Sequence, residues 1–91
     1  MLFSRKIARA FLTDSTLTDF RQIVEEAKIP EPYRKILDAK FIYGKSVNAI
    51  AIEYGYSIET VNRIIANGYD KVYKALRKAP VFRHGDISRV H

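Results

Sequence analysis

The stretch NAIAIEYGYSIETVNRIIANG, residues 48–68, contains two short apolar segments separated by a single glycine. Two helices that cross steeply through a tight turn need a small residue where they approach, a residue that accepts positive φ at the turn, and an aliphatic between them. Ala51, Gly55 and Val61 meet these needs in that order. The spacing predicts a helix-turn-helix at residues 46–66.

The caps and breaks around this stretch predict an all-α fold of about five helices. Ser46 and Ser57 are suited to cap the two helices of the motif, and Thr13 or Ser15 to cap an earlier one, because a side-chain oxygen accepts a bond from an orphan backbone N–H. Gly44 is expected to end the helix before the motif. The expected helices lie within residues 12–28, 32–43, 46–54, 57–67 and 69–79, with a turn at the Asn-Gly pair 67–68.

The two ends of the chain leave alternatives open. Residues 1–12 suit either a short helix capped by Ser4 or a basic arm. Residues 80–91, which follow Pro80, suit a short hairpin, a docking strand or a frayed tail.

Length and composition exclude several classes of protein. Ninety-one residues predict a single domain over residues 1–91, without cysteine and with His84 and His91 as the imidazoles. No metal, cofactor or catalytic residue is expected, since there is no glycine-rich phosphate loop and no carboxylate pair flanked by histidine. No apolar run approaches the roughly 20 residues that span a bilayer, so the sequence predicts a cytoplasmic protein without membrane contact.

The charge distribution points to a polyanionic partner. The net charge is +6 and the isoelectric point is about 9.7, which favours nucleic acid or an acidic surface. Residues 46–68 carry −1 and lie between residues 32–45 at +3 and residues 69–91 at +4. Basic segments therefore bracket the motif.

The outward side chains of the helix at 57–67 are typical of base recognition. Asparagine can pair with adenine and arginine with guanine through two hydrogen bonds, and the threonine methyl can contact thymine. The glutamate could accept from a cytosine amine or stabilise the helix N-terminus, and the second role is favoured. The residues expected to contact bases are Glu59, Thr60, Asn62, Arg63 and Asn67.

Basic and hydroxyl side chains around the motif are suited to hold the DNA backbone. Contacts to phosphate supply affinity and set the register of the protein on the duplex. The residues expected to contact phosphates are Lys40, Lys45, Ser46, Ser57, Lys71 and Lys74.

Two segments carry a resemblance to a known family. LTDSTLTDF at residues 12–20, followed by AKFIYGKSVNAIAIEYGYSIETVNRIIANGYDKVYKAL at residues 39–76, resembles the KorA/TrfB-type plasmid repressors. PapB-like fimbrial regulators are similar over a shorter span. The matching positions are Leu12, Thr13, Ser15, Ile42, Gly44, Lys45, Ala51, Gly55 and Val61.

This resemblance implies an all-helical, dimeric transcriptional repressor whose recognition helix carries Thr60, Asn62 and Arg63. The expected partners are double-stranded DNA and a second copy of the chain, on a palindromic site, with no small-molecule effector. Members of the family continue into a separate dimerisation segment, which has no counterpart here after Pro80.

Two other functions fit the same helical hairpin. A protein-interaction module, such as an antitoxin or a transcription accessory factor, would expose an apolar patch on the helix at 58–67. A promoter-recognition fragment resembling the last region of a sigma factor would bind polymerase as well as DNA.

Overall fold

The chain folds as five helices within residues 2–78, the part that the computed structural model describes, and this part contains no strand. The all-α prediction is confirmed. Residues 80–91, for which three alternatives were open, lie outside the described part. The helices are α1 (Leu2–Asp14), α2 (Leu17–Glu26), α3 (Glu31–Phe41), α4 (Val47–Tyr54) and α5 (Ile58–Lys78).

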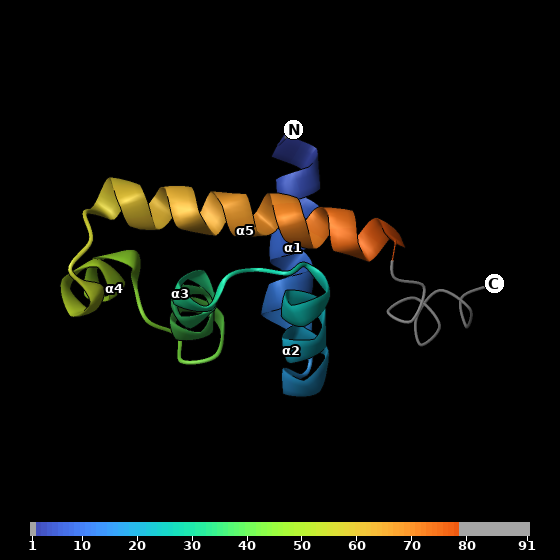
Figure 1. Ribbon diagram of the computed structural model, residues 1–91, viewed down its shortest axis with the longest axis horizontal. Coiled ribbons are helices and arrows are strands. Elements are labelled where there is room, and N and C mark those ends of the chain that lie inside the picture. The colour runs from blue at the N-terminus through green and yellow to red at the C-terminus, as the bar shows by residue number, and fades with distance from the viewer. Residues whose placement is uncertain (1, 79–91) are drawn as a thin grey trace.

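Helix α5 organises the fold, because it packs against each of the other four helices. Figure 1 shows α5 running along the longest dimension of the molecule, with α1 and α2 oriented across it and α3 and α4 gathered near its first half. Of the two alternatives for residues 1–12, the helix is observed, and it begins at Leu2 rather than after a cap at Ser4.

The predicted turn at residues 67–68 is wrong, since α5 continues through both residues without a break. Gly68 is buried and lies against the fully buried side chain of Leu37 on α3. A Cβ atom at Gly68 would come within 3.2 Å of both terminal carbons of Leu37. The glycine is therefore explained by the close approach of two helices, which a sequence pattern does not distinguish from a turn.

The residues that cap the two helices of the motif are the ones predicted from the sequence, whereas the residue that caps α2 is a different one. The hydroxyl oxygens of Ser46 and Ser57 accept bonds from the backbone N–H groups of the third residue after each, both at 3.1 Å. Thr16, and not Thr13 or Ser15, caps α2. The reason is that α1 includes Thr13 and its last turn still binds Ser15, whose backbone N–H donates to the carbonyl of Phe11.

The core consists of one side of α5 and the apolar faces that the other helices turn toward it. Some apolar residues of these helices stay outside the core, since Leu17, Tyr33 and Ile58 are 51%, 38% and 49% exposed. Leu17 and Ile58 each begin a helix, which places them at the edge of the packed region. The small residue Ala39 of α3 is buried. The buried core is Ala8, Leu12, Phe20, Ile23, Val24, Ile29, Ile36, Leu37, Ala39, Ile50, Ala51, Val61, Ile64, Ile65, Val72 and Ala75.

None of the helices within residues 2–78 combines the length and the apolar character that crossing a membrane requires.

The contact between Gly68 and Leu37 leads to a first prediction. Gly68→Leu adds a side chain where no space exists, so the free energy of unfolding should fall by about 1–3 kcal/mol. The matched control is Asn67→Leu, which places the same leucine side chain one position away on an exposed site and should change stability little. Urea denaturation of the three proteins measures both values, and equal stability of the two variants would contradict a close helix contact at Gly68.

The turn residue Gly55 leads to a second prediction. Its φ is +74° and no atom lies within 4 Å of a Cβ built there, so backbone strain and not collision should decide which residues are tolerated. Asn tolerates the left-handed region, whereas a β-branched residue resists it. Gly55→Val should lower the free energy of unfolding by about 1–2 kcal/mol and Gly55→Asn by clearly less, as measured by thermal denaturation. Equal losses would show that strain is not the cause.

Candidate nucleic-acid interface

Helices α4 and α5 form a tight helical hairpin through the three residues 55–57. Ala51 and Val61 are buried between them, and the carbonyl of Ala51 accepts the backbone N–H groups of Gly55 and Tyr56. In Figure 1, α4 is seen nearly end on while α5 runs across the view, so the two helices cross steeply. The three residues that the sequence singled out thus occupy the buried crossing and the turn.

The outward face of the first half of α5 presents Glu59, Arg63 and Asn67, all exposed. The guanidinium of Arg63 forms no ion pair with any carboxylate of residues 2–78. Glu59 lies in the first turn of α5, where its negative charge is favourable toward the helix dipole. These three side chains share one face because residues three and four apart are neighbours on a helix.

Two other predicted contact residues bond to each other in the helix cap. The hydroxyl of Ser57 donates to the Oγ1 of Thr60 over 2.9 Å, and its oxygen accepts the Thr60 backbone N–H. Thr60 is also half-buried. The polar atoms of this pair are engaged in beginning α5, which leaves the threonine methyl as the group best suited to touch a base.

The predicted phosphate contacts do not gather at one place. Lys45 pairs with Glu53 of α4 at 2.5 Å, and this hydrogen bond raises the pKa of Lys45 above its ordinary value. Lys71 and Lys74 border a shallow pocket on the flank of α5 that faces the end of α2. Lys40 lies on a different flank, in the pocket described next.

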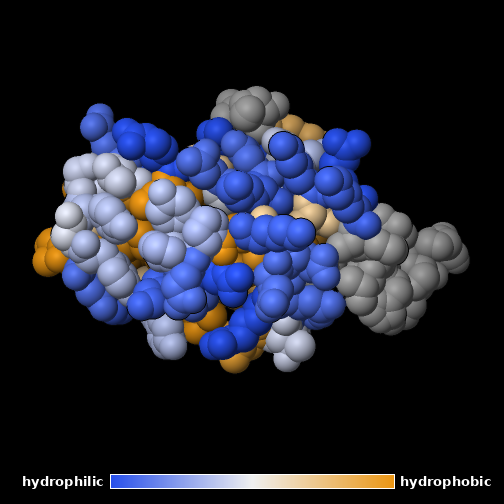
Figure 2. Space-filling model, in the orientation of Figure 1, coloured by the Kyte–Doolittle hydropathy of each residue, from blue (hydrophilic) through white to orange (hydrophobic). Residues whose placement is uncertain are grey.

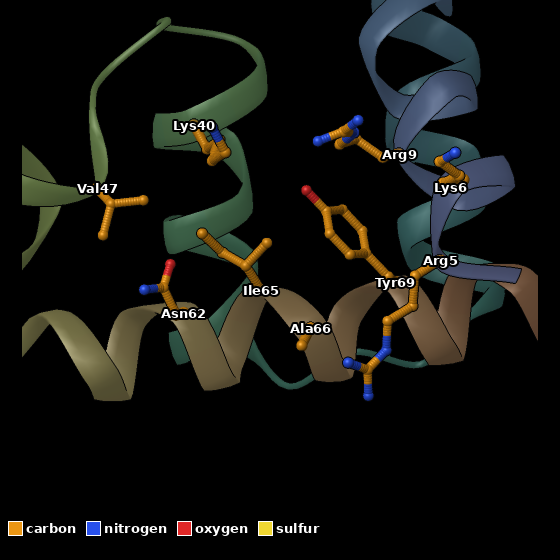
Figure 3. A pocket seen from close by; sticks show the side chains of 9 residues that line it. All are labelled: Arg5, Lys6, Arg9, Lys40, Val47, Asn62, Ile65, Ala66 and Tyr69. Carbon is orange, nitrogen blue, oxygen red and sulfur yellow. The ribbon is translucent and has the colours of Figure 1, made fainter. Parts of the chain in front are cut away.

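An open pocket of about 540 Å³, here called the basic pocket, lies where α1, α3, the start of α4 and α5 meet. Four of its lining side chains are cationic and none is acidic. In Figure 3, Arg9 and the hydroxyl of Tyr69 point toward its centre, the amide of Asn62 points into it from α5, and Lys40 lies on α3 across from Arg9. The lining residues are Arg5, Lys6, Arg9, Lys40, Val47, Asn62, Ile65, Ala66 and Tyr69.

A bidentate ion pair fixes α1 beside the pocket. The Nε and Nη2 atoms of Arg5 donate to the two carboxylate oxygens of Asp70 over 2.9 and 3.0 Å. This hydrogen bonding raises the pKa of Arg5 and lowers the pKa of Asp70. Because Arg5 and Asp70 are 65 positions apart, the pair joins the first helix to the last and places Lys6 and Arg9 along the rim.

The aromatic side of the pocket is held by ring packing. Tyr69 meets Phe41 edge to face, with ring centroids 6.1 Å apart, and the Nζ of Lys40 lies 5.6 Å from the centroid of the Phe41 ring. Burial raises the pKa of Tyr69, so its hydroxyl is protonated near neutral pH and can donate a hydrogen bond.

The sequence did not assign Arg5, Lys6, Arg9 or Tyr69 to a site. A signal for two of them is present, since Arg5 and Arg9 are four residues apart and lie on one face of α1, next to the buried Leu12. Nothing in the spacing shows that this side of α1 lies next to the motif, because that contact joins opposite ends of the chain.

Comparisons with known proteins leave the family of the chain undecided. No family model and no solved structure matches it. Among curated proteins, the ribosomal RNA small subunit methyltransferase H of Fervidobacterium nodosum is 30% identical over 89 residues. The match takes in 97% of this chain, which spans about 30% of the length of that relative. The resemblance to the KorA/TrfB-type repressors stays a prediction.

The Arg5–Asp70 pair predicts a pH-dependent stability. The lowered pKa of Asp70 means that its contribution is fully present above its ordinary value of 3.8 and is lost as the pH falls through the lower folded value. Asp70→Asn should therefore lower the melting temperature at pH 7, and its difference from the wild type should shrink below about pH 4. The control Asp14→Asn removes an exposed carboxylate at the end of α1. A difference for Asp70→Asn that stays constant from pH 7 to pH 2 would contradict the ion pair.

Proposed function

We propose that the chain is a sequence-specific double-stranded DNA-binding regulator of transcription, and that its α4–α5 hairpin is a helix-turn-helix. The observation that carries the proposal is the exposed face of α5 beside the tight turn, with Arg63 unpaired among the described residues. An exposed arginine that has no internal partner and a rigid helix beneath it is suited to bind guanine through two hydrogen bonds.

The dimensions of α5 support this role. A helix with its side chains is about 10–12 Å across, and the major groove of B-DNA is about 12 Å wide. Residues 57–67 would enter the groove with Arg63 and Asn67 toward the base edges, and Thr60 would offer its methyl group. Glu59 fits a role at the helix N-terminus.

Repression and action as a homodimer on a palindromic site belong to the proposal through the resemblance to the KorA/TrfB-type family. A location in the cytoplasm, expected from the sequence, is also part of the proposal. Half-sites about one helical turn apart would suit a close pair of subunits. Sizing by light scattering gives the number of subunits.

The methyltransferase relative brings in RNA as a partner, because its name refers to ribosomal RNA. A-form RNA has a deep, narrow major groove that side chains cannot read. Measuring the binding of an RNA duplex therefore distinguishes DNA from RNA as the partner. Insertion of α5 in the major groove predicts binding to duplex DNA and not to duplex RNA. Methyl transfer is not part of the proposal, because the sequence has no glycine-rich cofactor loop and spans only 30% of that relative.

A protein-interaction module is the second candidate, and one observation favours it. Exposed apolar side chains gather around α4 and the turn, with Ile52 83% exposed and Ile58 49% exposed. Figure 2 shows hydrophobic surface interleaved with polar surface at the end of the molecule where α4 lies, while the visible face over the second half of α5 is mostly hydrophilic. The expected patch on the helix at 58–67 is limited to Ile58, its first residue, because Glu59, Asn62, Arg63 and Asn67 fill the rest of the exposed surface there.

Arg63 provides the test of the proposed function. A duplex selected from a random library should bind Arg63→Ala more weakly by about 1–3 kcal/mol, whereas a random duplex should bind both proteins almost equally. The control Arg21→Ala removes the same charge from an exposed position on α2 and should leave the preference intact. Equal losses on the selected and the random duplex would show that Arg63 does not read a base, and failure to select any duplex would contradict the proposed function.

A further inference from the structure

We propose that the basic pocket is a phosphate site, and that it holds the sugar–phosphate backbone of one DNA strand while the outward face of α5 lies in the major groove. This inference rests on the proposed function and adds the residues that grip the backbone. It assigns the pocket to Arg9, Lys40, Asn62 and Tyr69, of which two were not predicted to touch DNA.

The position of the pocket follows from the geometry of α5. Successive residues on a helix are about 100° apart, because 3.6 residues make a turn. Asn62 and Tyr69 therefore lie to one side of the stripe formed by Glu59 and Arg63. A helix that nearly fills the groove has a backbone strand along each side, and the pocket lies along one of these sides.

The positive charge of the pocket suits a bound phosphate, because carboxylates of the described chain leave most of its cations without a partner. Asp70 compensates the charge of Arg5. Lys6, Arg9 and Lys40 form no ion pair with any carboxylate in the described part of the chain. Three uncompensated cations around one opening repel one another, and an anion bound between them relieves that repulsion.

The shape of the pocket suits a nucleotide backbone better than an isolated anion. Val47, Ile65 and Ala66 form an apolar side beside the polar one, as the carbon surface of a deoxyribose requires. The Tyr69 hydroxyl and the Asn62 amide can each donate a hydrogen bond to a phosphate oxygen. The Tyr69 ring is held in place by Phe41, so the donor is positioned before the ligand arrives.

This assignment changes the expected role of Asn62. Its amide points into the basic pocket (Figure 3), and helix geometry places Asn62 to one side of the stripe that carries Arg63. A backbone contact carries no sequence information. Asn62→Ala should therefore weaken the selected and the random duplex by the same factor, unlike Arg63→Ala, which should weaken the selected duplex alone.

The main test compares two double variants with the same charge. Arg9→Gln with Lys40→Gln removes two cations that face the pocket, and Arg21→Gln with Lys35→Gln removes two exposed cations from α2 and α3 outside it. The affinity of each for the selected and the random duplex is measured over a range of salt concentrations, after thermal denaturation has shown that both fold.

The pocket variant should lose affinity for both duplexes, and its slope of log affinity against log salt should be smaller in magnitude by about 2, since each phosphate contact contributes about 0.9. Its loss of affinity between 50 and 200 mM salt should accordingly shrink by about tenfold relative to the wild type. The control variant should show a smaller change in slope. Equal changes in the two double variants would overturn the inference, because net charge would then explain both.

A second arm separates DNA backbone from a free phosphorylated ligand. The NMR signals of the Asn62 side-chain amide are followed while inorganic phosphate is added to the wild type and to the pocket variant. Shifts that occur in the wild type and disappear in the variant, together with weaker DNA binding, support the inference. Shifts without any change in DNA affinity would assign the pocket to a free phosphorylated ligand and overturn the role in DNA binding.

The two proposals fail in different ways. If no duplex is preferred but the pocket variant still binds random DNA more weakly, the pocket holds DNA backbone and sequence-specific recognition is wrong. If Arg63→Ala relaxes the preference while the pocket variant binds as the control does, the regulator stands and the phosphate site is wrong.

Discussion

Burial of one side of α5 is the constraint on which the rest of the structure depends. All four other helices pack against this helix, and their buried side chains meet those that α5 turns inward, from Val61 to Ala75. The middle of this contact requires Gly68, because Leu37 occupies the space that a larger side chain would need. A single helix of 21 residues therefore serves both as the centre of the core and as the platform of the proposed interface.

Because the inner side of α5 is committed to the core, the position of every outer side chain is fixed relative to the other helices. Arg63 projects from a helix that is held along its length, so the backbone would lose little conformational freedom if this side chain bound a partner. The same rigidity holds Asn62 and Tyr69 beside α1 and α3. The proposed base reader and the proposed backbone site thus lie on neighbouring sides of one element, at a relative position set by the helix itself.

The polar contacts show how limited the role of surface charge is in this fold. Two ion pairs within residues 2–78, Arg5–Asp70 and Lys45–Glu53, are partly exposed, and exposed pairs stabilise a protein little. Their importance lies in position. The first joins the two ends of the described chain, and the second engages a lysine that the sequence had assigned to a phosphate. Cations that lack such partners are the ones available to an anion.

Several features of the motif could be predicted from the sequence because they depend on neighbouring residues. The caps at Ser46 and Ser57 and the left-handed turn at Gly55 are set by interactions within about four positions of the chain. The buried positions Ala51 and Val61 follow from helical periodicity. The exposed face of α5 was predicted for the same reason, since it is the side opposite the apolar residues.

The sequence by itself determined the helical class, the hairpin and the side of residues 57–67 that faces water, because local hydrogen bonding and periodicity act over a few residues. Only the tertiary structure decided that α5 runs unbroken through Gly68, that Lys40 and Asn62 lie together, and that Arg9 joins them. Such contacts connect helices far apart in the chain, and they depend on which faces pack together. An isolated stretch of sequence therefore has the same spacing whether its neighbour in space is solvent, a second helix or a basic pocket.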